Sequence, residues 1–100
     1  MPRRETSLSE YIRDYLQDHG EAYVSELKRG YEDYCENNDY SPPSYDSVRS
    51  TVWQLKQLGL IEPARTERTP GGIENRQYYR LSPGAVSEDW SDPRGRLYGR

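Results

Sequence analysis

Near the start of the chain, hydrophobic residues recur every three or four positions, which is the spacing of one face of an α-helix. Ser7 is followed three residues later by Glu10, which is the spacing of a capping box. Gly20 is suited to the left-handed conformation that ends many helices. The pattern predicts a first helix between Ser7 and Gly20. One stripe of this helix comprises Leu8, Ile12, Tyr15, Leu16 and His19.

A second helix is predicted after a short extended segment at residues 22–24. Ser25 can cap this helix. Gly30 lies inside it, where a glycine costs up to about 1 kcal/mol relative to alanine. We therefore expect either a neighbour that packs closely against Gly30 or a bend in the helix. One face of the helix carries Leu27, Tyr31, Tyr34 and Asn38.

A third helix is predicted over residues 45–58. It follows the stretch NNDYSPPS at residues 37–44, which reads as a loop because its two prolines cannot continue a helix. Either Ser44 or Asp46 can cap the helix, and Gly59 ends it. The stripe expected to face the core comprises Val48, Thr51, Val52, Leu55 and Leu58.

The segment at residues 61–81 predicts a β-hairpin. Two extended runs flank the sequence TPGG, in which Pro70 and Gly71 suit the second and third positions of a type II turn. Residues 82–100 contain three Gly and two Pro without periodicity, so we expect a flexible tail. Residues 1–6 are expected to be a loose N-terminus.

This order of elements resembles a winged helix-turn-helix domain. The segment TVWQLKQLGLIE, residues 51–62, is similar to the end of the recognition helix in many winged-helix regulators. Residues 31–64 are similar to part of the C-terminal winged helix of archaeal origin-recognition initiators. The sequence contains no Gly-rich phosphate loop, so we do not expect the chain itself to be an initiator.

The resemblance implies an α+β fold that is mostly α, a three-helix winged helix-turn-helix with a two- or three-stranded β-wing. It implies one winged-helix domain over residues 7–81. The partner implied is double-stranded DNA, with helix 45–58 in the major groove and wing 61–81 on the backbone.

The charge balance first argues against such an acidic partner, because the formal net charge is -3. The charge is, however, segregated along the chain. Residues 1–46 hold five basic and eleven acidic residues, whereas residues 47–80 hold six basic and three acidic ones. Local neutralisation of phosphates governs DNA binding more than total charge does. The third helix and the wing therefore form the half of the domain that favours DNA.

Composition narrows the remaining classes of function. A single Cys excludes an internal disulfide framework, and no apolar run approaches the roughly 18 residues of a membrane span. We expect a cytoplasmic protein, with a weak archaeal-like, salt-adapted bias in its twelve Arg against two Lys. The lone Cys35 and His19 offer neither metal-ligand spacing nor a convincing nucleophile–base pair. We expect no enzyme, no cofactor and no metal.

The outward face of the third helix carries side chains that can read bases. Arg can grip guanine O6 and N7 or a phosphate, Gln can pair with adenine, and Ser can take either role. Arginines near a glycine turn can hold the backbone or minor groove. The alternative is a solvated face, with wing arginines paired to Glu67 and Glu74. The candidate DNA-contacting residues are Ser47, Arg49, Ser50, Trp53, Gln54, Arg65, Arg68, Gly71, Gly72 and Arg76.

The two tryptophans have different surroundings. Trp53 lies on the outer face of the third helix, where packing under the wing against Tyr78 or Tyr79 is favoured over stacking on a sugar or base. Trp90 lies in the polar tail. It either folds back on the domain or anchors a protein partner or a second copy, and the sequence leaves both alternatives open.

These observations predict a double-stranded DNA-binding protein, in the role of a small transcriptional regulator. A homodimer is compatible with this role, because palindromic half-sites lie about 34–36 Å apart, but no dimer seam is evident. The alternative is a winged-helix protein–protein interaction module, for example in replication or viral assembly, without specific DNA binding.

Overall fold

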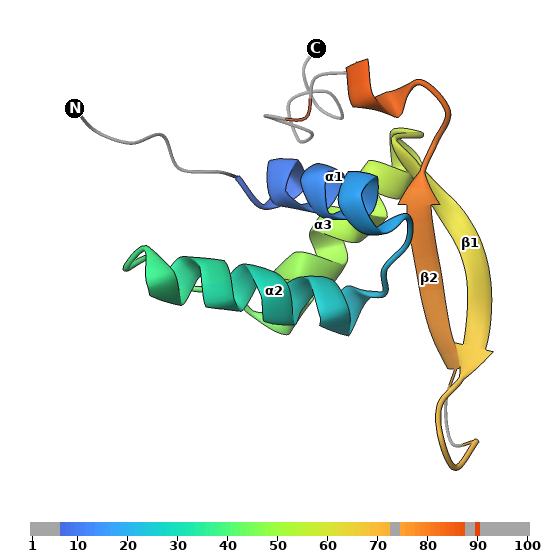
Figure 1. The fold of residues 1–100 in the computed structure, drawn as a ribbon, viewed down its shortest axis with the longest axis horizontal. Helices are drawn as coiled ribbons and strands as arrows, with labels where there is room; N and C mark the ends of the chain where they lie inside the picture. The colour runs from blue at the N-terminus through green and yellow to red at the C-terminus, as the bar shows by residue number, and fades with distance from the viewer. Residues whose placement is uncertain (1–6, 73–74, 88–89, 91–100) are drawn as a thin grey trace.

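Three helices and a β-hairpin make up the domain in a computed structural model that describes residues 7–72, 75–87 and 90. The fold is therefore α+β and mostly helical, as expected. Figure 1 shows the hairpin standing at one end of the helices and projecting beyond them. The elements are α1 (Leu8–His19), α2 (Val24–Asn37), α3 (Tyr45–Gln57), β1 (Ile61–Arg68), β2 (Asn75–Leu81) and a short 3-10 helix, η1 (Ala85–Ser87).

Serine caps begin α1 and α3. The Glu10 N–H donates to Ser7 Oγ at 3.2 Å, and the Ser7 N–H donates to Glu10 Oε1 at 3.1 Å, which confirms the capping box. Of the two candidates for α3, Ser44 is the cap, because its Oγ accepts from the Ser47 N–H at 3.2 Å. Asp46 is therefore left on the exposed first turn of the helix.

The start of α2 differs from the prediction. The helix begins at Val24 with Tyr23 as its N-cap, whereas Ser25 was expected to be the cap. The reason is tertiary: the backbone of Ala22 is paired with Tyr79 of β2, so the chain leaves the sheet at Tyr23 and turns directly into the helix. The Glu26 carboxylate accepts from the Tyr23 N–H at 3.4 Å.

Gly30 allows α1 and α2 to approach closely, which confirms one of the two expectations for this position. A Cβ atom there would collide with the hydroxyl group of Tyr11 on α1. The ring of Tyr11 also lies 5.2 Å from that of Tyr31 and 6.3 Å from that of Tyr34, between ring centroids. Tyrosine rings thus fill the interface between the two helices.

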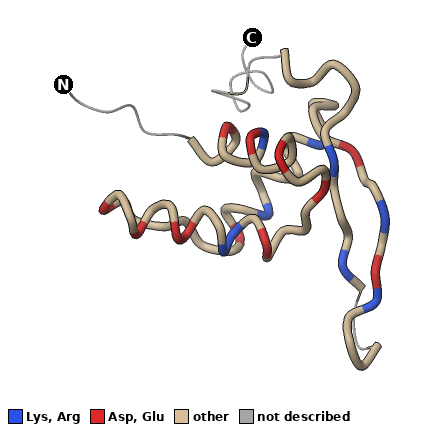
Figure 2. The backbone as a smooth tube through the Cα atoms, in the orientation of Figure 1, with Lys and Arg blue, Asp and Glu red and all other residues tan. Residues whose placement is uncertain are grey.

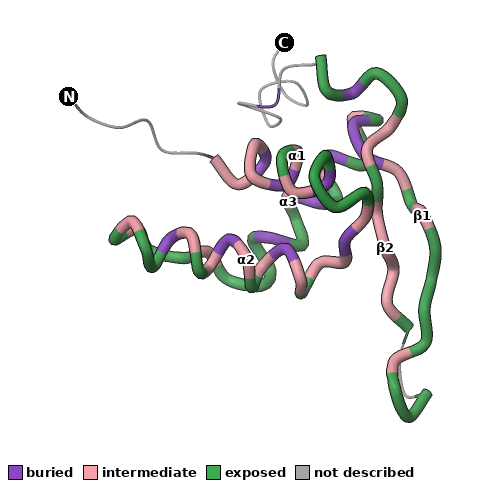
Figure 3. Tube along the Cα trace, in the orientation of Figure 1, coloured by how far each residue is buried: buried purple, intermediate pink, exposed green. Residues whose placement is uncertain are grey.

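The core lies where the three helices meet the base of the hairpin, and Figure 3 shows the buried residues on the inner faces of the helices. The predicted stripes of α1 and α3 are largely confirmed. His19 is an exception, because it is exposed and stacks on Tyr15 with 4.0 Å between ring centroids. Cys35 is buried, which agrees with a packing role. The buried cluster contains Ile12, Leu16, Ala22, Leu27, Val48, Val52, Leu55, Leu60, Ile61, Ala85 and Trp90.

The hairpin pairs β1 antiparallel to β2, from Ile61 opposite Leu81 to Arg68 opposite Asn75. The register shifts between Pro63 and Arg65, so one residue bulges from β1. The predicted type II turn is confirmed for its described residues. The Gly72 N–H donates to the Thr69 carbonyl at 2.8 Å, and Gly71 has a φ of 93°.

Trp90 folds back on the domain and is 1 % exposed. Its indole N–H donates to the Ala85 carbonyl at 2.8 Å, and the Ser9 hydroxyl on α1 donates to the Trp90 carbonyl at 2.5 Å. The expectation of a flexible tail over residues 82–100 is therefore wrong for its described part, and the core extends beyond residue 81. The indole is covered in this conformation, and a protein partner that binds through Trp90 stays a prediction. One large aromatic ring holds this segment against the core, and the segment has no hydrophobic periodicity from which the burial of the ring could be predicted.

We expect Trp90→Ala to lower the free energy of unfolding by about 3–5 kcal/mol, because the substitution leaves a cavity in the core. Urea denaturation followed by circular dichroism measures the change. Val86→Ala is the matched control, since Val86 lies on the same segment but is 45 % exposed. Its effect should stay within about 0.5 kcal/mol. Equal stability of the two variants would show that residue 90 does not belong to the core.

Candidate nucleic-acid interface

The outer face of α3 borders a shallow hollow of about 520 Å³, lined by Asp46, Arg49, Ser50 and Trp53. Three of these four residues are predicted contact residues, so the structure brings them together on one surface. Trp53 is 56 % exposed, and the expectation that it packs under the wing is wrong. The wing rings have other partners: Tyr78 packs edge-on against Tyr23, with 5.3 Å between centroids, and Tyr79 packs against the core.

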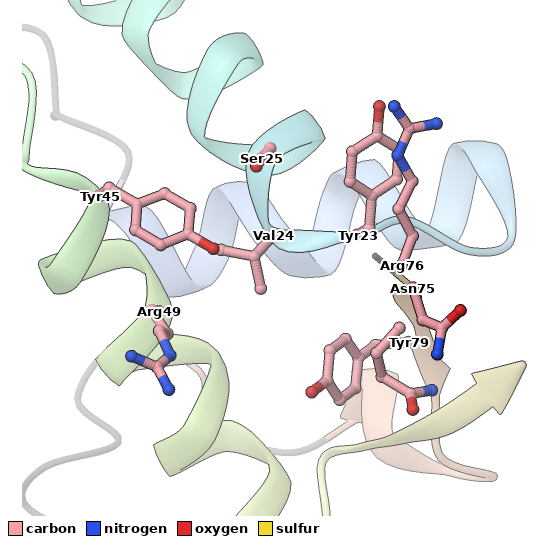
Figure 4. Close-up of a pocket in the computed structure, with 9 residues that line it drawn as sticks. Tyr23, Val24, Ser25, Tyr45, Arg49, Asn75, Arg76 and Tyr79 are labelled. Atoms are coloured by element: carbon pink, nitrogen blue, oxygen red, sulfur yellow. The ribbon is translucent and has the colours of Figure 1, made fainter. Parts of the chain in front are cut away.

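A second hollow, of about 390 Å³, lies between α3, the start of α2 and β2. Figure 4 shows Tyr45 and Arg49 projecting from α3 on one side and Arg76 and Tyr79 from β2 on the other. A smaller hollow of about 200 Å³ runs along α3 and includes Trp53 and Lys56. The exposed face of α3 and the near side of the wing therefore form a continuous surface, and Arg49 lines all three hollows.

This surface carries a positive balance. Among the described residues that line the three hollows, Arg49, Lys56 and Arg76 are cationic and Asp46 is the single carboxylate. Figure 2 shows mainly acidic residues along α1 and α2, alternating acidic and basic residues along β1, and basic residues on β2. Residues 7–44 hold nine acidic and three basic residues, so the acidic charge belongs mainly to these first two helices.

Arg49 is an exposed cation without an internal partner among the described residues. It has no ion pair or side-chain hydrogen bond there, in contrast to Arg13, Arg65 and Arg80, each of which contacts a carboxylate. A guanidinium that is not already satisfied by the protein keeps its donors for a ligand. Arg49 is therefore the best-placed anion-binding group of the hollows.

Arg76 is held in place by an aromatic ring. Its guanidinium carbon lies 4.6 Å from the centroid of the Tyr23 ring. On α2, Arg29 Nη2 donates to the hydroxyl of the same tyrosine at 3.3 Å. The ring of Tyr23 thus positions one cation from the wing and another from α2 on the same part of the surface.

Arg65 is engaged by carboxylates, as the alternative interpretation of the wing anticipated. Its Nη2 lies 2.6 Å from Glu21 Oε2, and its Nη1 lies 3.5 Å from Glu67 Oε2. The hydrogen bond with Glu21 raises the pKa of the arginine further above its ordinary value. Its guanidinium also stacks on Tyr78, 4.0 Å from the ring centroid. Glu74, the other expected partner, lies outside the described residues.

The remaining predicted residues do not line the hollows. Ser47 is exposed but accepts a hydrogen bond from Ser44 in the cap of α3. Gln54 is half-buried beside the stripe of the core. Arg68 donates to the Gly72 carbonyl at 3.2 Å and is exposed at the end of the wing, together with Gly71. A contact between these wing residues and DNA stays a prediction.

Several residues of the surface were missed by the reasoning from sequence. Tyr45 could have been found, because it shares the outer face of the predicted third helix and is 44 % exposed. The others come from elements that meet only in the folded domain, so no local pattern marks them. They are Tyr23, Val24, Ser25, Asn75, Gln77 and Tyr79. Lys56 differs from these, because it lies on α3 three residues after Trp53 and could have been found in the same way as Tyr45.

Comparison with known proteins found no matching family model, no matching curated protein and no matching solved structure. Within the described residues, no group of three or more His, Cys, Asp and Glu side chains is arranged to hold a metal ion. No helix in that part of the chain has both the length and the apolar character needed to cross a membrane. The assignment of a function therefore depends on the geometry of the surface.

We expect the pKa of Glu67 to lie below its ordinary value of 4.5, because the Tyr78 hydroxyl donates to its carboxylate at 2.9 Å and Arg65 lies close. Because the pKa is lowered in the folded state, the Glu67 carboxylate stabilises the wing at pH values above its ordinary pKa. This contribution is lost as the pH falls through the pKa of the folded state. An NMR titration of the carboxyl carbon measures it. Tyr78→Phe keeps the ring and removes the donor, so the pKa should rise towards 4.5. An unchanged value in this variant would exclude the hydroxyl as the main cause.

Proposed function

We propose that this protein binds double-stranded DNA as a winged helix-turn-helix domain. In this proposal α3 enters the major groove, and the hairpin follows the neighbouring backbone as the wing. The order of elements supports it: α1, a single-residue bridge at Ala22, α2, α3 and a hairpin follow one another as in that fold class. Fold alone does not establish function, so the argument must come from the surface.

The observation that supports the proposal most directly is the exposure of Arg49 together with its lack of an ion pair among the described residues. It is exposed at the centre of the three hollows, it lies on α3, and it has no ion pair with any described residue. An arginine on a helix in the major groove can donate to O6 and N7 of guanine, or to a phosphate. Arg76 and Lys56 on either side supply further positive charge for the backbone.

The acidic helices are compatible with this orientation. The carboxylates of α1 and α2 would lie away from the DNA if α3 and the wing face it, so repulsion is reduced while the local attraction remains. Two arginines offset two of the three glutamate charges near the wing, since Glu21 and Glu67 share Arg65 and Glu62 contacts Arg80. The proposed role is that of a small transcriptional regulator, acting as a monomer or as a homodimer on a palindromic site.

One observation favours a second candidate, a protein–protein interaction module. Tyr45, Trp53 and Val86 are the large apolar side chains exposed among the described residues. Two of them lie on α3, and exposed aromatic rings are enriched in protein interfaces. This candidate does not need Arg49 or Arg76, and it predicts weak duplex binding without sequence preference.

We expect Arg49→Ala to weaken binding to a preferred duplex by about 1–3 kcal/mol, which is roughly fivefold to 150-fold. The preferred duplex is obtained by selection from a random pool. Fluorescence anisotropy across a salt series gives the affinity and its salt dependence. A smaller slope of log K against log[salt] would assign Arg49 to a phosphate, whereas an unchanged slope with lost sequence preference would assign it to a base.

The matched control is Arg13→Ala, which removes the same charge from α1, where Arg13 contacts Asp14 at 2.9 Å. Its affinity for the duplex should stay close to that of the wild type. Equal losses in the two variants would mean that net charge, and not the α3 surface, governs binding. If the wild type binds no duplex even at low salt, the DNA-binding proposal fails and the protein-interaction candidate takes its place.

A further inference from the structure

The indole of Trp53 is an apolar ring beside Arg49, which has no ion pair in the described part of the chain. It is 56 % exposed and shares the hollow on α3 with Asp46, Arg49 and Ser50. The ring is not needed for the core, because the buried face of α3 is formed by Val48, Val52 and Leu55. Because the core does not use this indole, its apolar ring is available to a ligand, and tryptophan is enriched at interfaces.

The spacing of these residues matches the scale of DNA. Positions 49 and 50 each lie three or four residues from both position 46 and position 53, so the four residues share one helical face. The seven steps from Asp46 to Trp53 span about 10 Å along the helix, at a rise of about 1.5 Å per residue. Three base pairs occupy about the same length at roughly 3.4 Å each. Arg49 lies between the two ends of this face.

The charge of the hollow indicates which part of the duplex the indole meets. Asp46 lines the same hollow as the indole and offsets the charge of Arg49, so this hollow attracts phosphates less than the neighbouring surface with Lys56 and Arg76 does, and it is suited to base edges. A carboxylate accepts from N4 of cytosine, and an arginine pairs with guanine. The apolar group that bases expose in the major groove is the C5-methyl group of thymine, and 5-methylcytosine carries the same group at the same position.

We propose that Trp53 is a specificity-determining residue, which contacts the C5-methyl group of a pyrimidine within about three base pairs of a guanine bound by Arg49. This inference rests on the proposed binding of duplex DNA, and it adds what the site reads. Removal of the methyl group leaves the indole against a polar base edge and loses the burial of one apolar carbon.

The test uses duplexes selected by the wild-type protein from a random pool. Each thymine is replaced in turn by uracil, which removes the methyl group alone, and each cytosine in turn by 5-methylcytosine. If thymine is the partner, one uracil substitution should weaken wild-type binding about fourfold, which corresponds to about 0.8 kcal/mol. If methylcytosine is the partner, one methylation should strengthen binding by a similar factor.

The same series measured with Trp53→Ala should show no response at that position. Trp90 is then the single tryptophan of the variant, and its buried indole reports by fluorescence that the domain is folded. Val86→Ala is the matched control, because it removes an exposed apolar side chain that lies on η1 and lines none of the three hollows. Its ratio between the methylated and unmethylated duplexes should equal that of the wild type.

Two results would overturn the inference while the DNA-binding proposal stands. One is a wild type that binds its selected duplexes but responds to no methyl substitution. The other is a response that persists unchanged in Trp53→Ala. Absence of any duplex binding by the wild type is a different result, because it removes the proposed function itself.

Discussion

Two backbone hydrogen bonds between Ala22 and Tyr79 determine where the hairpin stands relative to the helices. The Tyr79 N–H donates to the Ala22 carbonyl at 2.8 Å, and the Ala22 N–H donates back at 3.1 Å. Because Ala22 immediately precedes α2, this pairing places β2 beside the start of that helix and opposite α3. The hollow between Arg49 and Arg76 exists because of this arrangement. A buried alanine without a reactive group thus shapes the surface on which the proposed function depends.

Local signals were sufficient to predict most of the helices and the hairpin. Ser7, Ser44 and Gly20 act through contacts within a few residues, so their roles follow from spacing alone. Two of the departures from prediction have tertiary causes. The N-cap of α2 is Tyr23 and not Ser25, because the pairing of Ala22 with β2 determines where the chain turns into the helix. Trp90 is buried by contacts with residues far along the chain, such as Ser9, and an aperiodic segment does not reveal them.

The part of the candidate surface that lies on α3 was predictable from the sequence. Helical geometry placed Arg49, Ser50 and Trp53 on a common outer face, because burial of the opposite stripe leaves them no other direction. The wing was harder to predict, since the state of each arginine depends on side chains from other elements. Arg65 is engaged by Glu21 from the connection between two helices, whereas Arg76 is held over Tyr23. Alternation along a strand cannot distinguish these two environments.

The irregularity of β1 has a consequence for association between copies of the chain. Among the described residues β1 pairs along one edge only, and such an edge invites the strand of another molecule to add to the sheet. Pro63 provides no N–H to an incoming strand, and the bulge that follows it breaks the regular repeat of donors and acceptors. A hairpin that projects from its domain is in this way protected against edge-to-edge aggregation, even at high local concentration on a shared ligand.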